Sequence, residues 1–124
     1  MILNITKSTD TGNNFMNPIF IDQRFRDPSN VQIVEDKNEL YIAAQGIPTN
    51  NNSLKNVEIF LINGSVTEDI FQNAVNISNN GGVSECPSLA VSGNKLYMIW
   101  EDDTLGNHEI LFSTNTLKTK GLVS

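Results

Sequence analysis

Histidine and cysteine are almost absent from this 124-residue sequence, which contains one of each, His108 and Cys86. A single cysteine cannot form an internal disulfide, and this pair cannot supply a metal site built on several His and Cys ligands. Cys86 precedes Pro87 and is expected to pack as a small apolar group. The sequence therefore excludes two common ways of stabilising a small domain.

Basic residues are also scarce, because 8 Lys and Arg stand against 14 Asp and Glu and give a formal charge of −6. No run of Lys or Arg occurs anywhere along the chain. Nucleic acids and anionic membranes attract proteins through a basic face. We therefore expect no nucleic-acid partner and no membrane partner.

Long apolar runs are missing as well. None exceeds five residues, as at 96–100, whereas a helix needs about 20 to cross a bilayer. The N-terminus lacks the features of a secretory signal, so either the protein stays where it is made or this chain starts inside a longer one, and the compartment stays open. A hydrophobic content of 39% with 18% charged residues predicts a folded chain.

No window carries apolar residues at helical spacing with capping residues, so we expect little helix. Asparagine is instead abundant, with 18 residues, and it tolerates left-handed backbone and closes turns. This composition favours short strands joined by Asn-rich turns. The strands expected in the best-preserved part of the chain are 30–34, 39–44, 57–62 and 74–77.

An internal repeat is the strongest signal in the sequence. The aligned segments are 38–45 with 94–101 and 15–22 with 71–78, both 56 apart, and 58–59 with 109–110, which are 51 apart. The first pair shares Asn, Leu and Tyr, and the last pair shares Glu and Ile. Three segments with nearly the same period predict that one structural unit occurs repeatedly.

A repeat of roughly 50 residues with about four strands is typical of β-propeller blades. Consecutive apolar residues, as at 96–100, are typical of strands buried on both faces. We therefore predict a single all-β repeat domain, a partial β-propeller of about two and a half four-stranded antiparallel blades. The expected units are a half blade (1–22), a complete blade (23–78) and a nearly complete blade (79–124). A two-sheet β-sandwich with duplicated hairpins is the alternative.

The first turn carries a motif, Ser-x-Asp-x-Gly-x-x-aromatic, at Ser8, Asp10, Gly12 and Phe15. Ser8 and Asp10 can bond turn amides, Gly12 can take a positive φ, and Phe15 can plug the turn into the core. The motif resembles the Asp-box of sialidase-like BNR-repeat β-propellers. The resemblance implies that the box lies between the third and fourth strands of a blade, away from the catalytic face. It also implies an extracellular or cell-surface location.

Residues 25–28, Phe-Arg-Asp-Pro, resemble the Phe/Tyr-Arg-Ile-Pro motif of sialidases. In that family the arginine belongs to a cluster of three that holds the substrate carboxylate, a task suited to the planar guanidinium group. The resemblance makes Arg26 the one catalytic candidate. This chain has only two arginines, Arg24 and Arg26, so we favour an ordinary surface role for Arg26 beside Asp27.

Carboxylates gather at 101–103, where Asp102 and Asp103 are candidate oxygen ligands for Ca²⁺. The spacing does not match an EF-hand loop, and the alternative is a solvated acidic loop. Ca²⁺ is the only cofactor that the sequence brings into consideration, and neither a metal nor another cofactor is required.

We expect a non-catalytic sialidase-like module that acts as a scaffold or as a recognition surface for a carbohydrate or a protein. The expected contact residues are Arg24, Arg26, Asn50 and Asn51, close to the long loop at 46–56. Terminal repeat units expose a sheet face, so other blades, or copies of the chain arranged head to tail, are expected partners. The alternative is a fragment or remnant of an exo-sialidase or a related glycoside hydrolase.

Overall fold

The computed structural model describes residues 4–21, 24–50 and 56–117. Over these ranges the chain is all-β, as predicted, with nine strands and no helix. Accordingly, these ranges contain no helix of the length and apolarity that crossing a membrane requires. The strands are β1 (Asn4–Ile5), β2 (Ile19–Phe20), β3 (Phe25–Asp36), β4 (Glu39–Pro48), β5 (Glu58–Ser65), β6 (Val75–Asn76), β7 (Ser84–Ser92), β8 (Lys95–Asp102) and β9 (Glu109–Thr116).

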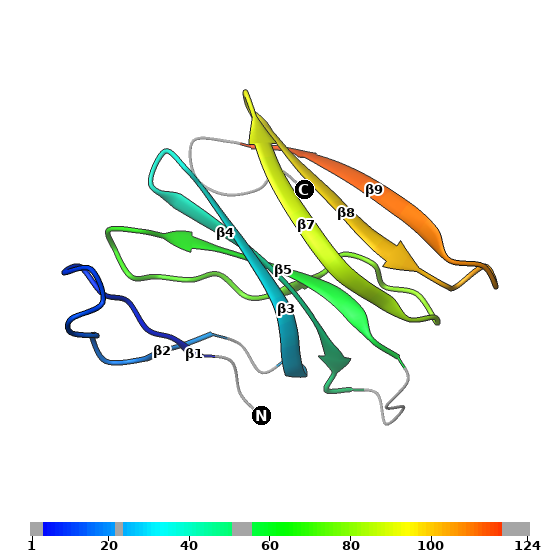
Figure 1. Ribbon diagram of the computed structural model, residues 1–124, viewed down its shortest axis with the longest axis horizontal. Coiled ribbons are helices and arrows are strands. Elements are labelled where there is room, and N and C mark those ends of the chain that lie inside the picture. Colours follow the sequence, from blue (N-terminus) through cyan, green and yellow to red (C-terminus); the bar gives the residue numbers. More distant parts are fainter. Residues whose placement is uncertain (1–3, 22–23, 51–55, 118–124) are drawn as a thin grey trace.

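The strands form three antiparallel sheets that follow one another in chain order (Figure 1). The N-terminal sheet is β1 with β2, the central sheet is β3 to β6 in sequential order, and the C-terminal sheet is β7 to β9. One apolar cluster joins the central sheet to the N-terminal sheet, and another joins it to the C-terminal sheet. The central sheet is therefore the middle layer of the molecule.

Two-residue turns set the register of the hairpins. Between β3 and β4, Lys37 and Asn38 have φ angles of 50° and 69°, the two positive values that a type I′ turn requires. Gly93, with φ of 60°, opens the corresponding turn between β7 and β8. Such turns match the twist of the flanking strands, and the pairing continues from them in register as far as Gln32 in β3 and Ser88 in β7.

The central and C-terminal sheets share one hydrogen-bonding register. Val34 pairs with Tyr41 in the central sheet, and Ala90 pairs with Tyr97 in the C-terminal sheet, each residue 56 further along the chain. All eight pairs between β4 and β5 recur between β8 and β9, at offsets of 56 and 51. The repeat seen in the sequence is therefore also a repeat of strand pairing.

A β-bulge occurs at the same place in both sheets. Asn30 in β3 and Cys86 in β7, 56 residues apart, have φ of 50° and 55°. The Gln45 side-chain oxygen accepts a hydrogen bond from Asn30 Nδ2 at 2.6 Å and another from the Cys86 backbone N–H at 2.9 Å. Cys86 itself is exposed, so the expectation that it packs as an apolar group is wrong, because the bulge takes it out of the strand's regular alternation.

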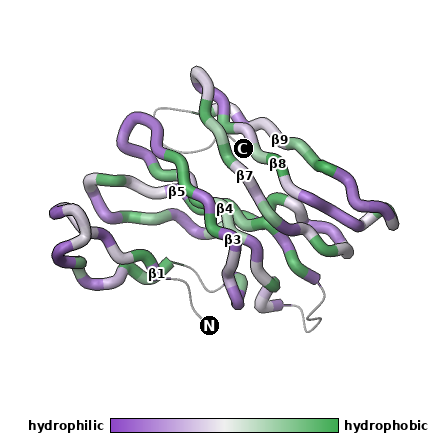
Figure 2. The backbone as a smooth tube through the Cα atoms, in the orientation of Figure 1, coloured by the Kyte–Doolittle hydropathy of each residue, from purple (hydrophilic) through white to green (hydrophobic). Residues whose placement is uncertain are grey.

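The strands β4 and β5 are apolar on both faces because both faces are covered. Residues buried toward the C-terminal sheet are Tyr41, Ala43, Ile59 and Leu61, and residues buried toward the N-terminal sheet are Ile42, Ala44, Phe60 and Ile62. Figure 2 shows hydrophobic residues along these strands and hydrophilic residues at many of the connections. Burial on both faces explains why these strands lack the usual alternation of apolar and polar residues.

The expectation that residues 96–100 are buried on both faces is wrong. In β8 the side chains of Leu96, Met98 and Trp100 are buried against the central sheet, whereas Ile99 is 42% exposed. Successive side chains of a strand point to opposite faces, and the described residues place a neighbouring sheet on only one face of the C-terminal sheet. Coverage by a neighbour, and not the apolar run itself, decides burial here.

Candidate functional site

The two larger sheets have chemically different ends. Turns join β3 to β4 and β7 to β8 at one end, which we call the turn end, and at the same end the chain turns back after β5, where Gly64 bridges to Phe71 and the Ser65 N–H donates to the Ile70 carbonyl. The connections that follow β4, β6 and β8 lie at the opposite end, which we call the loop end. There Gly46 pairs with Glu58, Asp102 pairs with Glu109, and the Ser84 N–H donates to the Val57 carbonyl at 2.8 Å.

The residues that resemble an Asp-box form a hydrogen-bonded turn. Ser8 Oγ accepts a bond from the Gly12 N–H at 2.9 Å, and Asp10 Oδ1 accepts one from the Asn14 N–H at 2.9 Å. Gly12 has φ of 86°. Hydrogen bonds from the side chain and backbone of Asn14 hold the pKa of Asp10 below its usual value. Ser8, Asp10 and Gly12 therefore act on the shape of the turn.

Phe15 does not plug this turn into a core, because its side chain is 63% exposed. The N-terminal sheet has only two strands of two residues each in the described ranges, so it offers little surface for the ring to cover. Phe71, 56 residues further on, does fill this role. Its ring occupies the space that a side chain at Gly64 would need, and it packs on the cluster between the N-terminal and central sheets.

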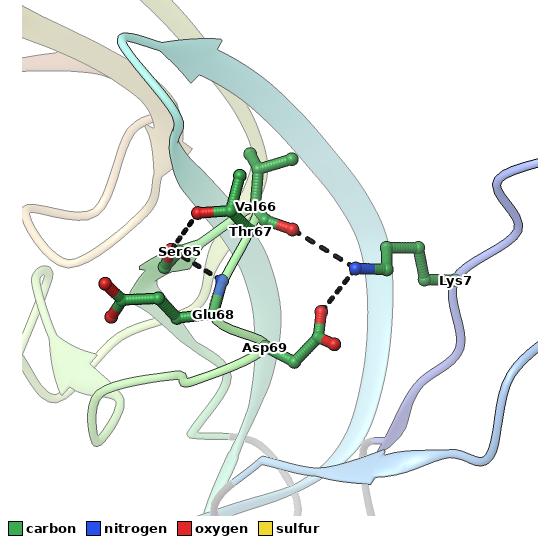
Figure 3. Close-up of polar contacts among 6 residues, drawn as sticks. All are labelled: Lys7, Ser65, Val66, Thr67, Glu68 and Asp69. Carbon is green, nitrogen blue, oxygen red and sulfur yellow. Dashed lines mark hydrogen bonds and ion pairs between the residues drawn. The ribbon is translucent and has the colours of Figure 1, made fainter.

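Lys7 ties the Asp-box hairpin to the turn end of the central sheet (Figure 3). Its Nζ donates to the Val66 carbonyl at 3.2 Å and forms an ion pair with Asp69 at 2.5 Å. Both side chains are partly exposed, so such a pair contributes up to about 1 kcal/mol. These contacts place the box at the turn end, away from the connections of the loop end.

Three of the four predicted contact residues lie at one corner of the loop end. Arg26 is in β3 opposite the end of β4, and the Arg24 carbonyl accepts a hydrogen bond from the Thr49 N–H at 3.0 Å, next to Asn50. Arg24 and Asn50 are exposed, and Arg26 is half-buried. Asn51 lies outside the described residues. The pairing of β3 with β4 therefore places Arg24, Arg26 and Asn50 near one another along the backbone.

Asp102 is buried at the loop end of the C-terminal sheet, with 3% of its surface exposed. The donors to its carboxylate are Ser84 Oγ at 2.6 Å, Asn80 Nδ2 at 2.7 Å, Trp100 Nε1 at 3.3 Å and the Thr104 N–H at 2.9 Å. Burial alone would raise the pKa of Asp102, but hydrogen bonds from these neighbours outweigh it and hold the pKa well below its usual range. Asp102 therefore stays ionised inside the protein.

Glu58 is the second buried carboxyl group of the loop end and is 1% exposed. Ser78 Oγ donates to Glu58 Oε2, and the Asn80 N–H donates to the same carboxyl group at 3.2 Å. Burial raises the pKa of Glu58 and the charge of Asp102 raises it further, while the bonds from Ser78 and Asn80 oppose this. Asn80 contacts both carboxyl groups, so it bridges the central and C-terminal sheets.

Sequence reasoning did not identify Glu58 as a site residue. The one available signal was a charged side chain at the start of the otherwise apolar segment 57–62. Such a residue is as compatible with an exposed strand end as with a buried one. Its enclosure involves residues further along the chain, because Ser78 and Asn80 of the connection after β6 donate hydrogen bonds to its carboxyl group.

The connections after β6 and β8 lie against one another. Asp103 Oδ1 accepts a hydrogen bond from the Val83 N–H at 2.7 Å. A Cβ atom at Gly82 would lie 2.5 Å from Thr104 Oγ1 and 2.7 Å from Asp103 Oδ1, so only glycine fits between the two connections. The buried carboxyl groups and this close approach together fix the shape of the loop end.

The predicted Ca²⁺ ligands Asp102 and Asp103 are neighbours in the sequence, and three of their carboxylate oxygens accept hydrogen bonds from the protein. Both oxygens of Asp102 accept hydrogen bonds from protein donors, and Asp103 Oδ1 accepts one from a backbone N–H. Across residues 4–21, 24–50 and 56–117, no group of three or more His, Cys, Asp or Glu side chains is placed to hold a metal ion. Asp102 at the end of β8 and Asp103 after it thus both accept hydrogen bonds that shape the loop end, and Ca²⁺ binding by them stays a prediction.

Comparisons of the chain with protein-family models, with curated proteins and with solved structures find no match. The site is therefore interpreted from its own geometry. Glu58 and Asp102 have the residue types of an acid and base pair, yet both are enclosed by protein atoms. Their chemistry at this position is to accept hydrogen bonds from the connections.

Proposed function

We propose that the chain is a non-catalytic, sialidase-like propeller module whose loop end is a recognition surface. The observation that carries this proposal is the buried network of Glu58, Asn80 and Asp102. In this network the two buried carboxyl groups hold the connections of the loop end in place, and both carboxyl groups are shielded from solvent. A surface with fixed connections is suited to binding, because little conformational freedom is lost when a ligand is bound.

Two features of the fold support the propeller architecture. The central and C-terminal sheets repeat one register, and the sheets stack in chain order with apolar clusters on both faces of the central sheet. Blades of a propeller are stacked in this way. A two-sheet sandwich has a single interface between its layers, so coverage of the central sheet on both faces favours the propeller.

Arg24, Arg26 and Asn50 supply the chemistry expected of the recognition surface. Guanidinium and amide groups donate hydrogen bonds to hydroxyl and carboxylate oxygens, which are abundant on acidic glycans. The long connection after β4 begins beside them. We therefore place the ligand contact at this corner, with an acidic carbohydrate as the ligand class to test first.

A glycan array combined with a fluorogenic sialoside assay tests the proposal. The wild-type chain is expected to bind acidic glycans without turning over the sialoside, and Arg26→Ala is expected to weaken binding about tenfold or more through loss of a charge-assisted hydrogen bond. Lys95→Ala removes an exposed cation near the turn end and serves as the matched control, with unchanged binding expected.

Sialoside turnover that disappears in Arg26→Ala would contradict the proposal and favour a remnant of an exo-sialidase or related glycoside hydrolase. Equal loss of binding in Arg26→Ala and Lys95→Ala would show general charge attraction and would also count against a built site. Absence of binding to every acidic glycan would reject this ligand class.

A further inference from the structure

The C-terminal sheet carries a contiguous apolar face that the described residues leave uncovered. We call it the outward face and define it by Tyr97, Ile99, Ile110 and Phe112. Ile110 is 67% and Phe112 is 61% exposed. Ile99 and Phe112 are direct cross-strand partners, and the Tyr97 and Phe112 rings stack with their centroids 5.8 Å apart. A joined patch of this kind on a soluble protein marks an interaction site more often than isolated apolar residues do.

The outward face has a covered counterpart within the same chain. Its four residues correspond in register to Tyr41, Ala43, Ile59 and Leu61 of the central sheet, at the offsets of 56 and 51. Those four side chains are almost fully buried, because Leu96, Met98, Trp100 and Leu117 cover them. The chain thus shows what covers this face when a neighbour is present: the apolar face of another sheet of the same kind.

The opposite side of the molecule also carries exposed apolar side chains, Phe20 and Ile33. Ile5 and Ile21 point from the N-terminal sheet toward the central sheet, so Phe20, one residue before Ile21, points away from it and is 54% exposed. Ile33 pairs with Ile42 and shares its face of the central sheet, yet it is 61% exposed. Exposed apolar residues therefore occur on the N-terminal side of the stack as well as on the outward face, with Phe20 on the N-terminal sheet and Ile33 on the central sheet.

We propose that the outward face binds a second copy of this chain through the side of that copy that carries Phe20 and Ile33. The contact continues the sheet stacking already present between the central and C-terminal sheets. It joins two different surfaces, so association is head to tail and can add further copies into a ring or filament. The proposal concerns the sides of the stack and does not depend on ligand binding at the loop end.

Light scattering after size-exclusion chromatography, over a wide range of protein concentration, tests the proposal with three variants. Phe112→Glu places a charge in the outward face and Phe20→Glu places one on the opposite side. Each is expected to weaken self-association at least about 30-fold, the effect of losing a central interface residue. Leu105→Glu changes an equally apolar, 81% exposed residue outside both surfaces and should associate like the wild type.

Mixing the two defective variants is the decisive step. Each retains one intact surface, so Phe112→Glu and Phe20→Glu together should form a complex of two chains and nothing larger. A wild-type chain that stays monomeric overturns the proposal, as does a Phe20→Glu chain that still self-associates, because the latter shows that outward faces bind each other. Circular dichroism checks folding, and Ile110→Lys replaces Phe112→Glu if that variant unfolds.

Discussion

Glu58 and Asp102 lie at the same buried seam, yet their protonation equilibria are displaced in opposite directions. Asp102 accepts four hydrogen bonds, three of them from side chains, and these favour its ionised form. Glu58 accepts hydrogen bonds from Ser78 and Asn80, but these do not outweigh its burial and the charge of Asp102, which raise its pKa. The two residues therefore respond differently to substitution and to pH.

Asp102→Asn is expected to lower the free energy of unfolding by about 2–4 kcal/mol, because charge-assisted hydrogen bonds are lost and buried donors are left without an acceptor. Urea denaturation measures this change. Glu109→Gln, which alters an exposed carboxyl group on the paired strand, should change stability by less than about 0.5 kcal/mol. Equal stability of Asp102→Asn and the wild type would contradict the anchoring role of Asp102.

The pKa of Asp102 also predicts how acid acts on the protein. Because this pKa is lower in the folded than in the unfolded chain, its contribution to stability is present above about pH 4 and is lost as the pH falls below that value. As the pH falls below about 4, the free energy of unfolding should therefore decrease less steeply for Asp102→Asn than for the wild type. The same urea titrations, repeated below about pH 4, measure this slope.

Glu58→Gln is expected to gain stability relative to the wild type as the pH rises above about 4.5. The pKa of Glu58 is raised in the folded chain, so its ionisation weakens the wild type progressively over this range, and the neutral amide does not ionise. Unfolding free energies of both proteins at several pH values measure the difference, in which other titrating groups cancel. A difference that stays constant with pH would contradict the burial of Glu58.

At the scale of elements, the connections after β6 and β8 are held together by close packing at Gly82. Gly82→Ala is expected to destabilise the protein by about 1–3 kcal/mol, because the added Cβ meets Thr104 and Asp103 and forces the connections apart. Chemical denaturation measures the loss. Gly81→Ala is the matched control, since a Cβ at Gly81 has no atom within 4 Å, and a similar loss in that variant would contradict the packing described here.

The strands and their pairing were largely predictable from the sequence. Local signals determine them: β-prone segments, a Lys-Asn turn and a Gly-Asn turn, and the period that joins Tyr41 to Tyr97. The all-β class follows from these features and from the absence of helical periodicity. The equivalence of the two larger sheets follows from the same alignment.

Burial was less predictable, because it depends on contacts between sheets. Ile59 and Ile110 are equivalent in the repeat, yet one is enclosed and the other is 67% exposed. The same limit applies to Phe15, whose motif predicts a buried ring, and to Glu58, whose carboxyl group is held by Ser78 and Asn80, 20 and 22 residues further along the chain. Arg24, Arg26 and Asn50 lie at one corner because β3 and β4 pair there, and their role as contact residues stays a prediction.

At the scale of the whole molecule, the chain is a stack of sheets, and the central sheet is covered by neighbouring sheets on more of its surface than the outer sheets are. The central sheet has an apolar cluster on each face, and the C-terminal sheet has one on a single face. The propeller proposal and the proposed contact with a second copy both follow from this order. The exchange rates of backbone amides in β4 and β8 measure this difference in coverage directly, because the two strands occupy equivalent positions with equivalent pairing.

Hydrogen exchange followed by NMR, at a concentration where light scattering gives a single chain, compares residues 41–44 with residues 97–100. The stacking described here predicts that the amides of 41–44 exchange at least about tenfold more slowly, since both faces of β4 are covered and only one face of β8 is. Equal exchange at the two segments, or slower exchange at 97–100, would contradict it.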